Sequence, residues 1–265
     1  MNNKPKENID LGRTMVNKAV ETAIATQVES AENIKINVDS QASQTIQGKA
    51  ESIEFFGEKI VAFKDIQLEQ INITSDNISL DLTQAILGKI AFEQPGNFKV
   101  KIIFTESDCD RLLNSEYVRI LLQSLALKIN HSSANFYLQQ AKCHLNDNGK
   151  VSLMATAVLN REQQIKTAEF QMALQFKQDG AVIKFKGGKY LDKQSLDLDE
   201  TVAILNKVRD LFYLRHFSNA DLAIDITSIE IKSQQLTLQG NMQIKKLPDS
   251  LAESIKSVAS EINNN

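Results

Sequence analysis

The residues that most often carry catalysis are few and scattered in this chain. The histidines, His131, His144 and His216, lie far apart, and no HExxH, GxSxG or P-loop spacing accompanies them. Cys143 and His144 are neighbours on a predicted strand, so their side chains point to opposite faces and cannot share a metal ion. The pattern predicts a protein that is not an enzyme and has no catalytic residue, cofactor or metal site.

Two groups of carboxylates are explained by helix capping. Thr105 and Asp108 have the spacing of a capping box, which predicts a helix, or two short helices broken near Asn114-Ser115, running to about residue 125. The second group lies at the start of another predicted helix, residues 199–212: Asp197, Asp199 and Glu200. Acidic side chains are favourable at the positive end of a helix, so neither group requires a chemical role.

Lysines gather around a glycine pair, Gly187-Gly188. The candidate head-group or membrane-surface residues are Lys184, Lys186, Lys189 and Lys193. Clustered lysines near an aromatic side chain such as Tyr190 attract anionic head groups, at about 1 kcal/mol each near a membrane. The alternative is that they are the solvated face of a strand. The glycine pair lacks phosphate-loop spacing, so a bulge or turn explains it.

Apolar residues recur at every second position through most of the chain, which is typical of strands with one dry face. The segment 98–104 shows this most clearly, with Phe98, Val100, Ile102 and Phe104. A similar pattern occurs at 71–80 and 229–238, and each copy predicts a strand, a turn and a strand. In the first copy the turn is expected at Ser75-Asp76-Asn77. The sequence therefore predicts a large antiparallel sheet with one apolar surface.

Composition limits the function classes. The net charge of −3 gives no reason to expect a nucleic acid partner. Cys109 and Cys143 are too few for a disulfide framework, so we expect free thiols in a reducing compartment. Residues 1–8 are polar and form no signal peptide, and no stretch approaches the roughly 20 apolar residues of a spanning helix. We expect a cytoplasmic protein, free or peripheral at the inner membrane face.

Helices are predicted at about 10–28, 105–125, 199–212 and 250–262, with strands between them. This order predicts the α+β class and does not require a parallel sheet. We expect residues 1–9 to be a disordered tail and residues 10–262 to be a single domain. The alternative is two sheet halves, 10–127 and 128–262.

A resemblance to a known family covers at least residues 9–122, and it is carried most clearly by the residues from Phe104 onward. The matching residues are Phe104-Thr105-Glu106-Ser107-Asp108, Arg111 and Asn114-Ser115-Glu116-Tyr117-Val118. They resemble a stretch of a bacterial family of unknown function, in a cyanobacterial-type branch related to the LmeA-like phospholipid-binding proteins. The resemblance implies an elongated, curved antiparallel β-sheet wrapped around long amphipathic helices, as in tubular lipid-binding (TULIP/BPI-like) folds. It implies no catalytic residues.

A helix laid along one apolar sheet face leaves an elongated channel if the fit is incomplete. Acyl chains suit such a channel, because each buried methylene contributes about 0.8 kcal/mol. The candidate lining residues are Met15, Ala19, Ile71, Ile73, Phe98, Val100, Ile102, Phe104, Leu121 and Leu122. The alternative is that these residues fill an ordinary core.

The sequence thus favours non-enzymatic binding or carriage of a phospholipid, or another long apolar ligand, with transient membrane contact. The alternative is a ligand-free interaction scaffold at or near a membrane surface, which would use residues 212–217 or an exposed strand edge. Protein partners are left open.

Overall fold

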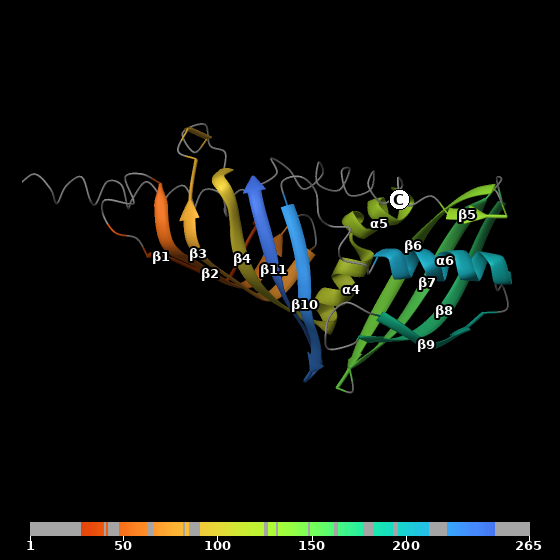
Figure 1. The fold of residues 1–265 in the computed structure, drawn as a ribbon. Helices are drawn as coiled ribbons and strands as arrows, with labels where there is room; N and C mark the ends of the chain where they lie inside the picture. The colour runs from red at the N-terminus through yellow and green to blue at the C-terminus, as the bar shows by residue number, and fades with distance from the viewer. Residues whose placement is uncertain are drawn as a thin grey trace, which may run out of the picture.

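The computed structural model describes two antiparallel sheets and the helices α4 (Glu106–Asn114), α5 (Glu116–Ser124) and α6 (Leu198–Leu211). The described residues are 28–39, 41, 48–62, 66–81, 83–84, 91–124, 127–130, 132–147, 149–161, 164–176, 183–192, 196–211 and 222–246. Figure 1 shows the two sheets side by side, with α4 and α5 between them and α6 lying across the second sheet.

The first sheet has the strand order β1-β2-β3-β4-β11-β10. Its strands are β1 (Asn33–Asp39), β2 (Lys49–Ala62), β3 (Ile66–Ser79), β4 (Ala91–Thr105), β10 (Leu222–Lys232) and β11 (Gln235–Lys246). The hairpin β10–β11 pairs along β4, with Leu238 opposite Ile102. A segment late in the chain therefore completes the sheet that β1 begins.

The register of the first sheet gathers apolar side chains on one face. Ile73 lies between Phe55 of β2 and Val100 of β4. The next row of the same face pairs Ile71 with Ile102. The predicted one-faced strand at 98–104 is therefore confirmed as part of β4.

The predicted turn at 75–77 is wrong. β3 continues through Ser75, Asp76 and Asn77, and it pairs with β2 on both sides of this segment. Asn77 takes a left-handed φ of 53°, which its short polar side chain tolerates inside the strand. In the second copy of the pattern the turn does form, at Ser233 and Gln234 between β10 and β11. β2 pairs with Asp76 and Ile78 and keeps this part of β3 extended, whereas Ser233 and Gln234 lie beyond the last pair of their hairpin, Lys232 with Gln235.

The second sheet is a meander with the order β5-β6-β7-β8-β9. Its strands are β5 (Leu127–Ile129), β6 (Ser132–Asn146), β7 (Lys150–Arg161), β8 (Gln164–Phe176) and β9 (Ile183–Tyr190). Where β6 leads into β7, Gly149 N–H donates to the carbonyl of Asn146 at 3.0 Å. The register between β8 and β9 shifts beside Gly187, so the predicted bulge at the glycine pair is confirmed.

The described helices follow the capping signals of the sequence. α4 starts at the predicted capping box, α5 follows the predicted break at Ser115, and α6 starts after Asp197. Mostly antiparallel strands with few helices are compatible with the α+β class. The predicted helices at 10–28 and 250–262, and residues 212–217, lie outside the described residues. The long helices and the likeness to tubular folds therefore remain predictions.

One apolar core joins the two sheets. It contains Phe55 and Phe104 of the first sheet, Cys109 of α4, and Leu153 and Met172 of the second sheet. Because β10–β11 completes the first sheet, the sheets do not correspond to a single division of the chain. The division into one domain or two halves remains a prediction.

Candidate functional site

The predicted groove residues of β3 and β4 share the apolar face of the first sheet. Ile71, Ile73, Val100 and Ile102 are half-buried and form two adjacent cross-strand pairs. We call these four residues the central strip. Side chains that are neither fully packed nor fully exposed are the kind that can still gain contacts from an apolar ligand.

Two buried clusters flank the central strip. Phe98 is 8% exposed and belongs to the cluster at one end, where its ring meets Phe92 edge to face at 5.6 Å. Phe104 is 7% exposed and belongs to the core that joins the two sheets. Ile73 packs against both clusters, so the strip spans the space between them.

The remaining groove candidates do not join the central strip. Leu121 and Leu122 are buried on α5, and Leu122 packs in a separate cluster with Phe136 and Leu159 of the second sheet. Met15 and Ala19 lie outside the described residues.

The predicted head-group lysines lie on the second sheet. Lys184, Lys186 and Lys189 are exposed on β9, and Lys193 lies outside the described residues. β9 is the edge strand farthest from β5. The structure therefore places the lysines and the central strip on different sheets.

The stretch that carries the family resemblance forms a joint between α4 and the edge of β6. Three side chains of α4 bond to backbone amides of β6: Glu106 Oε1 accepts from Leu145 N at 2.6 Å, Asp110 Oδ1 from Cys143 N at 2.6 Å, and Asn114 Oδ1 from Ala141 N at 2.8 Å. Asn114 Nδ2 also donates to the Ala141 carbonyl at 2.7 Å. We call this set the edge ladder.

The geometry of regular elements explains the spacing of the edge ladder. Four helix residues rise about 6 Å, and two strand residues rise about 6.6 Å, so the two repeats stay matched over a short distance. The α4 side chains therefore bond to the part of β6 beyond its pairing with β5, which reaches only Ala134. These carboxylates satisfy backbone amides and are not free for chemistry.

Other residues of the same stretch fix the ends of the helices. Thr105 Oγ1 accepts from Asp108 N at 3.2 Å, and Asp108 Oδ2 accepts from Thr105 N at 2.8 Å, which completes the predicted capping box. Ser115 Oγ accepts from Val118 N at 3.3 Å at the start of α5. Arg111 Nη1 donates to Gln67 Oε1 of β3 at 2.6 Å. The matching residues are thus architectural.

The two cysteines meet beneath α4 as free thiols. A hydrogen bond to Cys143 and burial both raise the pKa of the Cys109 thiol. Because the thiolate is the nucleophilic form, Cys109 is unreactive at neutral pH. His144 does not face these thiols: its Nδ1 lies 2.7 Å from Glu106 Oε1.

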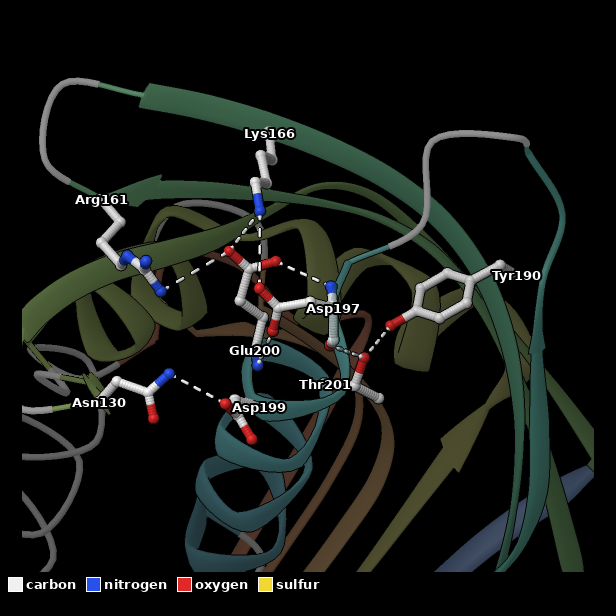
Figure 2. A network of polar contacts seen from close by, with 8 residues as sticks. All are labelled: Asn130, Arg161, Lys166, Tyr190, Asp197, Asp199, Glu200 and Thr201. Carbon is white, nitrogen blue, oxygen red and sulfur yellow. Dashed lines mark hydrogen bonds and ion pairs between the residues drawn. The ribbon is translucent and has the colours of Figure 1, made fainter.

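A polar network holds the first turn of α6 against the second sheet (Figure 2). Glu200 is 1% exposed, and its Oε1 lies 2.6 Å from Lys166 Nζ and 3.9 Å from Arg161 Nη1. Its Oε2 accepts from Asp197 N at 3.0 Å, while Asp197 Oδ1 accepts from Glu200 N at 2.9 Å. The predicted capping role of these carboxylates is confirmed, and the buried Glu200 also pairs with charged residues of β7 and β8. We call this network the α6 clamp.

An apolar cavity that the sequence did not indicate lies beside the α6 clamp. We call it the α6 cavity. It has a volume of about 200 Å³, and residues of β7, β8, β9 and α6 line it, Lys189 among them. Small residues on the strands, Ala157 and Gly188, leave this space open. Small residues form no motif, so no sequence signal could have found the cavity.

A wider hollow of about 590 Å³ lies over β3, β4, β11 and β10. Ser75 and Phe98 of its lining are buried toward the apolar face, so their neighbours Thr74 and Lys99 point to the opposite, solvated face. Asp76, Asn97, Asp225, Asn241 and Gln243 complete its polar lining. Ala223, Ile224 and Met242 add apolar surface, so the lining of this hollow is mixed.

Two further properties bear on function. In the described part of the chain, no helix has both the length and the apolar character needed to cross a membrane. Within the same residues, no group of three or more His, Cys, Asp or Glu side chains has a metal-binding arrangement.

Comparison with known proteins adds one finding. The sequence model of a family described as LmeA-like phospholipid-binding matches residues 8–241. A search of curated proteins gave no match. The matched range includes both sheets up to β11, and so contains the central strip, the edge ladder and the α6 cavity.

Proposed function

Because the chain belongs to the LmeA-like phospholipid-binding family, we propose that it binds or carries a phospholipid without catalysing a reaction on it. The acyl chains lie along the central strip, Ile71, Ile73, Val100 and Ile102. The observation that carries this assignment is the half-burial of four adjacent aliphatic side chains between two fully buried clusters.

The energetics of acyl binding suit this strip. Each methylene removed from water contributes about 0.8 kcal/mol, so a contact of a few methylenes is already substantial. Branched aliphatic side chains on a pleated sheet offer contact without polar groups that would need partners. The head group lies outside the strip at a polar rim, and the lysines of β9 are the proposed point of membrane contact.

The absence of catalysis is part of the same proposal. The carboxylates of α4 bond to backbone amides of β6, and Asp197 and Glu200 hold the start of α6. Within the described residues, none of these groups has an unoccupied partner with which it could form a nucleophile–base pair.

Uptake of a fluorescent phospholipid from vesicles tests the proposal. Ile73→Glu places a carboxylate in the middle of the strip and should reduce uptake by at least about tenfold, because a charge is costly to bury against an acyl chain. Thr74→Glu is the matched control, since the neighbouring residue points to the solvated face and should leave uptake unchanged.

Thermal unfolding of both variants shows whether they fold. If Ile73→Glu is unstable, Ile73→Gln replaces it, because the amide has similar length and no charge. A folded Ile73→Gln protein with wild-type uptake would count against the central strip as the acyl site.

A further inference from the structure

The walls of the α6 cavity are apolar, and most of the side chains in them are buried. The apolar residues that line it are Ala157, Phe170, Met172, Leu196, Ile204 and Leu205. Ala157, Met172, Leu196 and Ile204 are each less than a tenth exposed. Met172 lies opposite Gly188 on β9, so the inner face of the sheet has no side chain at that position. The cavity is open to solvent on one side.

The hydroxyl groups in the wall already have partners. Thr201 Oγ1 donates to the carbonyl of Asp197 at 2.7 Å, so the Tyr190 hydroxyl donates to Thr201 Oγ1 in turn (Figure 2). Neither hydroxyl has a donor proton left for a ligand. The interior therefore favours a hydrocarbon over a polar molecule.

The volume sets the size of the occupant. An apolar protein cavity of about 150 Å³ stays dry and accepts benzene, so a cavity of about 200 Å³ has room for a few more carbon atoms. The end of one acyl chain fits this space, whereas the two chains of a phospholipid do not.

The charge around the opening favours an anionic head group. Lys189 belongs to the lining of the cavity, and Lys184 and Lys186 are exposed on the same edge strand. Lys189 pairs with Gln171, so its side chain leaves β9 on the face opposite Met172 and Gly188, and it reaches a head group around the edge of the sheet. Within the described residues none of these three lysines forms an ion pair. Two acidic residues lie at the end of β9: Leu191 N donates to the carbonyl of Glu169 at 2.8 Å, and Asp192 Oδ2 accepts from the amide of Glu169 at 3.0 Å.

We propose that the α6 cavity is a second binding site, which takes a single-chain amphiphile and prefers an anionic one such as a fatty acid. The chain end enters between α6 and β8, and the carboxylate stays at the edge of β9 beside Lys189. The site is on the second sheet and does not require the first sheet to bind phospholipid. The failure of one proposal therefore leaves the other standing.

A series of short carboxylates tests the site in the full-length chain. Binding of butanoate, hexanoate, octanoate and decanoate is measured by titration calorimetry, below the concentrations at which they form micelles. Affinity should increase about fourfold for each added methylene, the equivalent of transferring that methylene out of water. It should level off beyond octanoate, once the cavity is full. Octanol should bind about threefold more weakly than octanoate, because an exposed ammonium contributes little.

Variants separate the cavity from other surfaces. Ala157→Leu fills the space and should abolish octanoate binding, while Thr156→Leu adds the same group on the opposite face and should not. Lys189→Gln should remove the preference for octanoate over octanol. Lys142→Gln is the matched control, because Lys142 is exposed on β6 and away from the cavity.

Contacts in the wild-type protein give a test that needs no variant. Nuclear Overhauser effects should connect the terminal methyl of octanoate to Met172 and Leu205. Contacts to other methyl groups only would overturn the proposal, as would unchanged octanoate binding in folded Ala157→Leu. Absence of octanoate binding to the wild-type protein would overturn it as well, whatever the result of phospholipid uptake.

Discussion

The helices α4 and α6 start with the same capping motif, but they contact the second sheet in different ways. Each begins with a capping box, Thr105 with Asp108 in α4 and Asp197 with Glu200 in α6. α4 is then bonded along its length to β6 by the edge ladder. The described polar contacts of α6 with the sheet are confined to its first turn, and an open cavity follows.

The difference separates architecture from binding. A helix fixed at three successive points leaves no room for a ligand beneath it, and the buried residues under α4 form a closed core. A helix fixed at one end leaves space wherever the facing side chains are small. The stretch that carries the family resemblance thus builds the joint, whereas the proposed acyl-chain sites lie away from it.

The largest expected effect comes from removing the edge ladder. The triple variant Glu106→Ala, Asp110→Ala and Asn114→Ala leaves three backbone amides of β6 without their acceptors. We expect the free energy of unfolding to fall by about 3–5 kcal/mol. Chemical denaturation measures this, with Asp110→Asn as the control, because the amide keeps an acceptor oxygen. A triple variant as stable as the wild type would show that the ladder is not a joint.

The next largest effect compares the same substitution beneath each helix. Ala141 is 2% exposed under α4, so Ala141→Leu should overpack the core and cost about 2–3 kcal/mol. Ala157→Leu beneath α6 should change stability by less than about 1 kcal/mol, because the cavity accepts the added group. Equal losses in the two variants would mean that α6 is packed as closely as α4.

A smaller effect is expected at the α6 clamp. Glu200→Ala removes one half of the capping box and the buried partner of Lys166. We expect a loss of about 1–2 kcal/mol, lower than for a fully buried ion pair because Lys166 is 41% exposed. Amide hydrogen exchange should increase in the first turn of α6 and stay unchanged in α4. Increased exchange in both helices would contradict the view that α4 and α6 are held by separate sets of contacts.

The smallest effect is expected at Arg111, although it belongs to the stretch that matches the family. Its bond to Gln67 is exposed, so Arg111→Ala should lower stability by less than about 1 kcal/mol. If thermal unfolding shows that the free energy of unfolding falls by 2 kcal/mol or more, the joint also includes the contact with the first sheet.

The sequence predicted those features that depend on local chemistry. The capping box at Thr105, the capping role of the carboxylates at the start of α6 and the alternation from Phe98 to Phe104 were predicted correctly, and the break near Ser115 was one of two predicted alternatives. Each of these features is encoded within a few residues. The turn at 75–77 was not, because pairing with β2 keeps this part of β3 extended.

Features that depend on distant segments were not visible in the sequence. Glu106, Asp110 and Asn114 have the spacing of any solvated helix face, and only the position of β6 makes them a ladder. The pairing of β11 with β4 joins segments more than 100 residues apart. The α6 cavity exists because Ala157 and Gly188 have no large side chains. No sequence motif marks such positions.

Native mass spectrometry of protein purified without detergent, before and after incubation with phospholipid vesicles, tests the central claim most directly. The account predicts one phospholipid bound per chain, retained in Thr74→Glu and lost in Ile73→Glu. A protein mass without lipid in the wild type, before and after incubation, would contradict phospholipid binding and favour the ligand-free interaction scaffold.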